Sequence, residues 1–579
     1  MLGLAWIVIS VGLGPAAEAP LAGVSRVPTA AGGQEWVEAT LATMSLEEKA
    51  AQLVGIRGTG LFRNPDSREA RRLFDLVERT GIGTVCLFEG EVESLPGLLN
   101  GLQARAHVPL LVAADLERGL AFRIRKGVVP LPWNMAVGAT RSENAAHFAG
   151  SIAAREARAL GVHWGLAPVV DVNNNPDNPV INIRSFGEDP DLVSRLGVAW
   201  IEGARSGGLL TTAKHFPGHG DTSVDTHLQI ATVRGKRSRL EAVELPPFRA
   251  AIGAGVDAVM VGHIAALALD ATGEPATLSQ PIGRLLREGL GFSGIVVTDA
   301  MDMAGVKATW TAEATVRAVE AEADLVLLPP YPEVAVEAIV RAVKSGRLGR
   351  ARLDASVRRL LEAKARLGLH TNRYVDPAAA RQAVDRPEDE SRALDIARDS
   401  ITVIRNEGGI LPLQKDQPLS VLHLVLSSDM RNPAISGVPE AELARRGIHS
   451  ETESFGPQMS PAEIDRLVAL ARSRTHVLAS CFVRVTGSKG TADMVAGHAR
   501  LLRRLADAGT PVVVVSYGSP YLLRQFPAVP VYVAAYGSAE SSQRAAIEVL
   551  LGEYPSRGRL PVTLPGFYPC GHGLMLPVR

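Results

Sequence analysis

Short apolar runs rich in Val, Leu and Ile recur eight times between residues 52 and 329, and amphipathic segments separate them. Runs that are apolar throughout are typical of strands buried on both faces, as in a parallel sheet covered by helices. Eight strand–helix units over about 280 residues predict an α/β fold of the (β/α)8 TIM-barrel type. The eight runs are 52–56, 84–88, 110–115, 165–172, 209–216, 258–264, 294–299 and 325–329.

A second α/β pattern follows this region. A chain of 579 residues is too long for one hydrophobic core, so at least two domains are expected. We place the barrel at residues 35–370, which include an amphipathic helix at 352–368, and a polar, proline-containing linker at 371–394. The remainder, 395–579, predicts a smaller doubly wound α/β domain. Its expected strands are 400–405, 420–426, 476–485, 511–517 and 530–535.

Polar side chains follow five of the eight apolar runs, where the barrel strands should end. Active sites of such barrels lie at the carboxyl ends of the strands. A single polar strand end is often only the point where a strand meets solvent, but five together favour a catalytic face. These candidates are Asp115, Asp171 with Asn173, Lys214 with His215, His263 and Asp299.

The loop 214–227 is the densest of these strand ends, with three histidines, two aspartates and a lysine. It cannot be mostly helical, because Pro217 and Gly218 interrupt it. Asp225 and His227 are two residues apart, so the carboxylate can fold back onto the imidazole, fix its tautomer and raise its pKa. Such a pair suits a general acid/base.

Two other interpretations of this loop exist. His215 and His219 are four residues apart, which is the spacing of a zinc-binding helix, but Pro217 and Gly218 break the helix that this spacing needs. The other interpretation is a solvated segment with incidental charges. We therefore expect neither a metal ion nor any other cofactor.

Composition argues against several functions. Lys+Arg and Asp+Glu are 61 each and no polybasic run exists, so neither a nucleic-acid partner nor an electrostatic membrane contact is expected. Cys86, Cys481 and Cys570 are too far apart for a disulfide framework or a zinc site, and we interpret them as core or surface thiols. The second domain has no G-x-G-x-x-G or Walker motif, so nucleotide binding is not expected. The oligomeric state does not follow from these features.

The first 19 residues have the pattern of a signal peptide. Residues 2–13 are apolar and uncharged, Gly-Pro follows, and 17–19 is the A-x-A sequence Ala-Glu-Ala. The apolar run is too short to span a bilayer, so no membrane span is expected in the mature chain. No basic residue precedes the run, and the alternative is a buried N-terminal element in a cytoplasmic protein. We expect export to the periplasm or the medium.

The sequence from Lys214 to Thr222, KHFPGHGDT, with the D-x-H of Asp225 and His227, resembles the signature of glycoside hydrolase family 3 in its β-N-acetylglucosaminidase branch. The resemblance implies that Asp299, at the end of the seventh run, is the nucleophile, and that His227, paired with Asp225, is the acid/base. A neutral histidine beside an anionic nucleophile avoids like-charge repulsion. Asp302 is the local alternative to Asp299, but it lies where a helix should begin and where acidic residues commonly face the helix dipole.

Two further stretches carry the resemblance and imply sugar-binding residues. Residues 115–123 resemble D-x-E-G-G-x-x-x-R, although Arg118 stands where a glycine is usual. Residues 182–190 resemble N-R-S-F-G-E-D-P, with Ile183 before the arginine where Asn is usual. Contacts of Arg and Asp with vicinal hydroxyls are the expected chemistry, and a surface ion pair is the alternative for the arginine of the first stretch. The implied substrate-binding residues are Asp115, Arg123, Arg184, Lys214 and His215.

The resemblance implies a retaining exo-β-N-acetylglucosaminidase that acts on a small carbohydrate through a covalent glycosyl-aspartate intermediate. Murein fragments of the cell wall or chitooligosaccharides are the expected substrates. The alternatives are a β-GlcNAc phosphorylase and a β-glucosidase or xylosidase of the same family, which would take its acid from a glutamate in the second domain. A non-catalytic sugar-binding protein would require loss of a catalytic residue, and Asp225, His227 and Asp299 are all present.

Overall fold

The computed structural model describes residues 32–61, 67–226, 229–303, 312–414, 419–430, 435, 437–483 and 490–578. The predicted signal peptide, residues 1–19, and the predicted acid/base His227 lie outside these ranges.

Eight parallel strands form a closed barrel in the first domain. They pair in the orders β10-β1-β2-β3-β4 and β5-β7-β9, and parallel bridges close the ring between Trp164 and Leu210 and between Val297 and Leu325. The predicted (β/α)8 barrel is therefore confirmed. The strands are β1 (Val54–Gly60), β2 (Thr84–Gly90), β3 (Leu111–Ala114), β4 (Trp164–Gly165), β5 (Thr212–Phe216), β7 (Ala258–Val261), β9 (Ile295–Thr298) and β10 (Val326–Leu327).

Two features of the barrel differ from the pattern of apolar runs. The fourth run was expected to be a strand over 165–172, but regular pairing ends at Gly165 and returns only in a bridge between Val169 and Lys214. Pro168 lies between them and has no N–H for a ladder hydrogen bond. In addition, β6 (Ala231–Val233) and β8 (Ile264–Ala266) form a separate parallel pair after β5 and β7.

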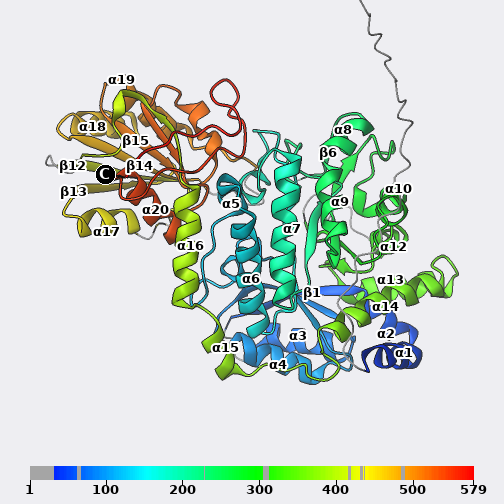
Figure 1. The fold of residues 1–579 in the computed structure, drawn as a ribbon. Coiled ribbons are helices and arrows are strands. Elements are labelled where there is room, and N and C mark those ends of the chain that lie inside the picture. The colour runs from blue at the N-terminus through cyan, green and yellow to red at the C-terminus, as the bar shows by residue number, and fades with distance from the viewer. Residues whose placement is uncertain are drawn as a thin grey trace, which may run out of the picture.

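Helices follow the strands and cover the outside of the barrel (Figure 1). The helix α14, which ends the predicted barrel domain, packs against the N-terminal helix α1. The helices are α1 (Gly33–Thr43), α2 (Leu46–Gln52), α3 (Arg68–Glu78), α4 (Leu95–Arg105), α5 (Asn134–Thr140), α6 (Glu143–Ala159), α7 (Pro190–Ser206), α8 (Arg237–Ala242), α9 (Leu245–Gly253), α10 (Gln280–Arg284), α12 (Ala312–Glu320), α13 (Pro332–Lys344) and α14 (Arg350–Arg366).

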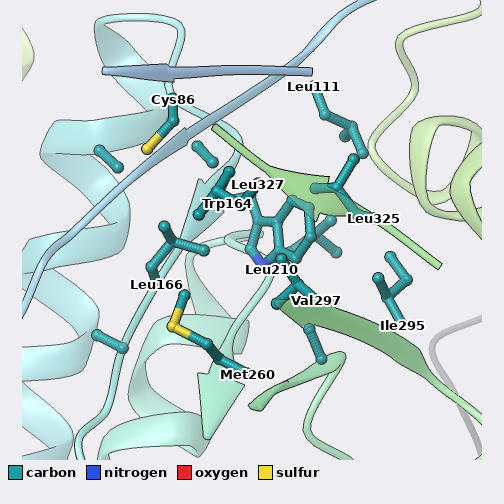
Figure 2. Close-up of a cluster of buried hydrophobic side chains, with 14 of the residues drawn as sticks. Cys86, Leu111, Trp164, Leu166, Leu210, Met260, Ile295, Val297, Leu325 and Leu327 are labelled. Atoms are coloured by element: carbon teal, nitrogen blue, oxygen red, sulfur yellow. The ribbon is translucent and has the colours of Figure 1, made fainter. Parts of the chain in front are cut away.

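Large apolar side chains fill the barrel interior (Figure 2). Trp164 is fully buried there among Leu210, Met260 and Val297, and its indole N–H donates a hydrogen bond of 2.7 Å to the hydroxyl of Thr212. The buried polar atom of the ring is thus satisfied. Because the interior is packed, a substrate can reach the strands only at their ends.

The second domain is a six-stranded sheet with helices on both faces, as a doubly wound fold predicts. The strand order is β11-β16-β15-β14-β12-β13, and only β11 is antiparallel to its neighbour. Helices α18, α19 and η6 cover one face, and α16 (Pro387–Ser400), α17 and α20 cover the other. The elements are β11 (Thr402–Asn406), β12 (Ser420–Ser427), α17 (Val438–Arg445), β13 (His449–Phe455), α18 (Pro461–Ala471), β14 (His476–Phe482), α19 (Ala496–Asp507), β15 (Val512–Ser516), η6 (Pro520–Gln525), β16 (Val531–Ala534) and α20 (Glu540–Leu550).

The two domains share an apolar interface at α5. Met135, Ala136 and Ala139 of this helix, with Ile183 from the loop before α7, are at most 3% exposed and belong to the same buried cluster as one face of the second-domain sheet. The segment expected as a linker folds into α15 (Pro377–Ala383) and the start of α16 (Pro387–Ser400), which rises beside the barrel toward the second domain (Figure 1). Among the described residues, no helix combines the length and the apolar character needed to cross a membrane.

Glu156 on α6 ties the junction between α15 and α16 to the barrel. Its carboxylate is fully buried, and Oε1 accepts hydrogen bonds of 3.0 Å from the backbone N–H groups of Val129 and Asp385. Burial raises the pKa of Glu156 from 4.5 to about 7. The folded protein therefore keeps a proton that the unfolded chain releases between about pH 4.5 and pH 7, and this group's contribution to stability falls as the pH rises through that window.

We therefore expect Glu156→Gln to raise the Tm at pH 8 and to leave it almost unchanged at pH 4.5. Glutamine keeps the accepting oxygen and removes the charge, so the gain in unfolding free energy is at most about 3 kcal/mol. Thermal unfolding of both proteins at the two pH values tests this expectation. The same shift in Tm at both values would show that the charge of Glu156 is not the cause.

Candidate active site

A cleft of about 820 Å³ lies at the carboxyl ends of the barrel strands. Residues at the ends of β3, β5, β9 and β10 line it, as expected for a barrel enzyme. The second domain forms part of the wall, so it completes the cleft. Its contributing residues are Phe482, Val483, Tyr517, Ser538, Ala539 and Glu540.

A network of ion pairs forms one side of this cleft. Lys214 Nζ lies 2.7 Å from Asp115 Oδ1 and 2.9 Å from Glu117 Oε1. Arg184 donates two hydrogen bonds of 2.8 Å to the two oxygens of Glu117, and Arg123 pairs with Asp115. Four of the five predicted substrate-binding residues therefore meet at one point, and Arg123 is mostly buried rather than on the open surface. Charged groups held in this way present fixed donors and acceptors to the hydroxyls of a sugar.

Both carboxylates of this network are ionised at neutral pH. Burial alone would raise the pKa of Asp115, but Lys214 and Arg123 outweigh it and hold the pKa at about 2. Burial opposes ionisation of Glu117 in the same way, and Arg184 with Lys214 holds its pKa well below the usual range. The two anions therefore keep their charge across the neutral pH range.

Asp171 contacts His215, which is part of β5, and His219, which lies in the loop after this strand. Its Oδ2 lies 2.7 Å from Nδ1 of His215, and its Oδ1 accepts a hydrogen bond of 2.7 Å from the backbone N–H of His219. His215 is the fifth predicted substrate-binding residue, and its Nε2 lies 3.4 Å from Arg184 in the ion-pair network. A carboxylate at Nδ1 places the ring proton there and leaves Nε2 as the acceptor.

His219 is neutral and lies in the loop, not on a helix. Its ring nitrogens lie 2.7 Å from the Thr222 hydroxyl and 3.1 Å from the Thr226 hydroxyl, and burial lowers its pKa to about 4. The rings of His215 and His219 meet edge to face with centroids 5.9 Å apart. Each ring nitrogen of His219 thus has a hydroxyl partner, and the zinc-helix geometry is absent from this part of the described chain.

Asp299 directly follows β9 and lines the cleft, half-buried. Its backbone N–H donates to Val261 O at 2.9 Å, and its Oδ1 accepts from the N–H of Ala300 at 2.8 Å. His263 Nε2 lies 3.0 Å from the carbonyl oxygen of Ala300, which fixes the peptide between Ala300 and Met301. Asp302 also lines the cleft, but its carboxylate pairs with Arg57 at 2.8 Å. Both carboxylates therefore line the cleft, and the choice of Asp299 as the nucleophile stays a prediction.

The structure describes the loop after β5 as far as Thr226. Asp225 is 2% exposed, and Thr226 lines the cleft directly before His227. The described part of the loop therefore reaches the cleft at Thr226. The Asp225–His227 pair itself stays a prediction.

Two residues of the ion-pair network and its surroundings were not among the predicted site residues. Glu117 is the third residue of the D-x-E stretch, and this was the signal that could have identified it. Asp171 was noted as a polar strand end, without a role in the site. Both are buried, and they hold Arg184, Lys214 and His215 in place.

Polar contacts fix the second domain against this side of the barrel. The amide of Asn173 donates to the hydroxyl of Tyr521 at 3.2 Å. The carboxylate of Glu188 accepts hydrogen bonds of 2.7 and 2.6 Å from the N–H and the hydroxyl of Thr563. The two walls of the cleft are therefore joined by direct hydrogen bonds.

The strand ends of this TIM barrel carry a buried network of carboxylates and cations, and a second α/β domain closes the cleft. This arrangement is that of a two-domain enzyme for small polar substrates. The chain matches the glycosyl hydrolase family 3 N terminal domain over residues 45–363 and the glycosyl hydrolase family 3 C-terminal domain over residues 401–567. It belongs to glycoside hydrolase family 3 and is a glycoside hydrolase.

Several known proteins are similar over almost their whole length. A beta-N-acetylglucosaminidase/beta-glucosidase of Cellulomonas fimi is 30% identical, with 92% of this chain and 96% of the relative covered. Beta-hexosaminidase A of Pseudoalteromonas piscicida is also 30% identical, with 85% and 91% covered. The structure of a family 3 beta-N-acetylglucosaminidase from Paenibacillus sp. str. FPU-7 superposes with a TM-score of 0.80 at 32% identity, with 90% and 99% covered. A beta-glucoside phosphorylase gives a TM-score of 0.84 at 26% identity, with 93% and 97% covered.

Proposed function

We propose that this protein is a retaining exo-β-N-acetylglucosaminidase. The observation that carries the proposal is the cleft, which Asp299, directly after β9, and the Asp115–Lys214–Glu117–Arg184 network line together. A buried polar network beside a packed barrel core suits the recognition of one terminal sugar. It leaves the open side of the cleft for the rest of the substrate.

In the proposed mechanism Asp299 attacks the anomeric carbon and forms a carbon–oxygen bond as the glycosidic bond breaks. His227 gives its proton to the departing oxygen, and Asp225 stabilises the imidazolium form before that transfer. Water then attacks the same carbon, His227 takes the proton of that water, and Asp299 is released. The sugar leaves with its original anomeric configuration because it has been displaced twice.

The sugar class is supported by the names of the relatives. The enzymes from Cellulomonas fimi and Pseudoalteromonas piscicida are named as a beta-N-acetylglucosaminidase/beta-glucosidase and as a beta-hexosaminidase. We propose terminal β-GlcNAc as the preferred sugar, released from murein fragments or chitooligosaccharides. Export, as expected from residues 1–19, would bring the enzyme to these substrates.

We expect kcat/KM for 4-nitrophenyl β-GlcNAc to exceed that for 4-nitrophenyl β-glucoside by at least about tenfold, or roughly 1.4 kcal/mol of differential transition-state binding. The acetamido group supplies this difference, and the β-xyloside serves as a third substrate. Steady-state kinetics on the three glycosides measure it. Hydrolysis of the glucoside with equal or greater efficiency would refute the N-acetylglucosaminidase assignment and leave the family unchanged.

A phosphorylase is the second candidate, because the fold matches a beta-glucoside phosphorylase and because Arg118, Arg125 and Lys126 line the cleft. A phosphorylase would use phosphate in place of water in the second step. Repeating the assay with inorganic phosphate separates the two activities. Hydrolysis predicts the free sugar as the product whether or not phosphate is present, whereas phosphorolysis predicts the glycosyl phosphate.

A further inference from the structure

The loop after β5 is anchored first at its beginning. Asn178 Nδ2 donates to the carbonyl oxygens of His219 and Gly220 at 2.8 and 2.9 Å, and Asp171 holds the N–H of His219. Gly220 approaches the neighbouring backbone so closely that a Cβ there would lie 1.7 Å from the carbonyl oxygen of Val172. The part of the loop up to Gly220 is therefore fixed to the barrel.

A second anchor holds the loop at the next residue. Arg239 Nη1, from α8, lies 2.8 Å from Asp221 Oδ2 and 3.1 Å from Glu244 Oε1. The side chain of Glu244 is 1% exposed and lies directly beneath the loop, since a Cβ at Gly218 would be 2.7 Å from its Cγ. Arg239 thus joins a carboxylate on the loop to a carboxylate buried below it.

The three charged groups influence one another. Burial raises the pKa of Glu244 to about 7, while Arg239 lowers it, Asp221 raises it further and the side chain of Asn174 lowers it. A carboxyl group that is buried to this extent ionises readily only beside a cation. The charge on Glu244 therefore depends on Arg239, which is also the group that holds Asp221.

The chain between Asp221 and Arg239 carries the predicted acid/base. It contains Asp225 and His227, and then β6, which pairs with β8. The Asp221–Arg239 pair closes this segment at its base. We propose that Asp221, Arg239 and Glu244 form a clamp that positions the acid/base loop for proton transfer to the leaving group. The proposal rests on the proposed function and names the residues that position its proton donor.

The clamp should affect the position of the acid/base loop more than the free energy of unfolding of the whole protein. The side chains of Arg239 and Asp221 are 32% and 31% exposed, and ion pairs with that exposure contribute about 1 kcal/mol or less to folding. A displacement of about 1 Å in a catalytic group can lower a rate about a hundredfold. Loss of the clamp should therefore affect the proton transfer while the protein stays folded, because Glu244 can bind a proton when its cation is removed.

The experiment compares Arg239→Ala with Arg237→Ala. Arg237 is on the same helix and pairs with Glu241 at 2.9 Å, and both side chains are exposed, so this variant is the matched control. We expect Arg239→Ala to lower kcat about ten- to a hundredfold for an alkyl glycoside with a poor leaving group, and less than about threefold for 4-nitrophenyl β-GlcNAc. KM should change little. Arg239→Lys should recover part of the loss, and Arg237→Ala should behave as wild type.

Hydrogen exchange supplies a readout that does not depend on activity. Peptides covering residues 219–230 should exchange faster in Arg239→Ala and at the wild-type rate in Arg237→Ala. Unchanged exchange overturns the clamp. The clamp is also overturned if Arg239→Ala lowers kcat equally for the alkyl and the 4-nitrophenyl glycoside while His227→Ala affects the alkyl glycoside more. If His227→Ala does not discriminate, the proposed acid is wrong, and the exchange alone then decides whether the clamp holds the loop. Asp221→Asn repeats the test without removing a long side chain, should Arg239→Ala fail to fold.

Discussion

Replacing Asp299 with alanine should lower kcat by at least about a thousandfold, which corresponds to roughly 4 kcal/mol of lost transition-state stabilisation. The carboxylate of Asp299 lies in the cleft directly after β9, and without it no glycosyl-enzyme intermediate can form. The fold should survive, because Asp299 is half-buried and its carboxylate bonds locally to the N–H of Ala300. Steady-state kinetics with thermal unfolding as the folding check measure this result.

Asp302→Ala is the natural comparison for this variant, since Asp302 lines the same cleft but pairs with Arg57. We expect a much smaller loss for it. A 5-fluoro sugar inactivator should label Asp299, as peptide mapping can show. A label on Asp302 would overturn the assignment of the nucleophile.

Replacing His227 with alanine should lower kcat/KM at least about a hundredfold for alkyl glycosides and far less for 4-nitrophenyl glycosides. A poor leaving group needs the proton of His227, whereas 4-nitrophenolate leaves without it. Asp225→Ala should act in the same direction, because it removes the carboxylate that stabilises the imidazolium. Kinetics on a series of leaving groups measure the effect, and equal losses along the series would assign His227 another task.

The barrel could be predicted from the sequence because its signal is local. Strands buried on both faces require apolar runs, and the polar residues that end them are visible at once, as at Asp115, Lys214 and Asp299. The strand β13 was not predicted, because its sequence has no such apolar run. Its residues His449–Phe455 read HSETESF, and they form an edge strand that is mostly accessible to solvent, so no apolar run marks it.

The roles of Glu117 and Asp171 could not be predicted in this way, because both depend on partners that are distant in the chain. Glu117 pairs with Arg184, 67 residues away, and Asp171 holds His215, 44 residues away. No spacing rule connects such residues before the fold brings them together. The D-x-E stretch pointed to the right segment but could not say which of its side chains would bind the neighbouring cations.

The apolar interface at α5 limits how this protein could have lost or gained its second domain during evolution. Met135, Ala136, Ala139 and Ile183 are buried in a cluster that they share with one face of the second-domain sheet. A protein consisting of the barrel alone would expose these side chains as an apolar patch that promotes association, unless polar residues stood in their place. Loss of the second domain would therefore leave an apolar patch at α5 and Ile183, and a stable barrel alone would need polar residues at these positions.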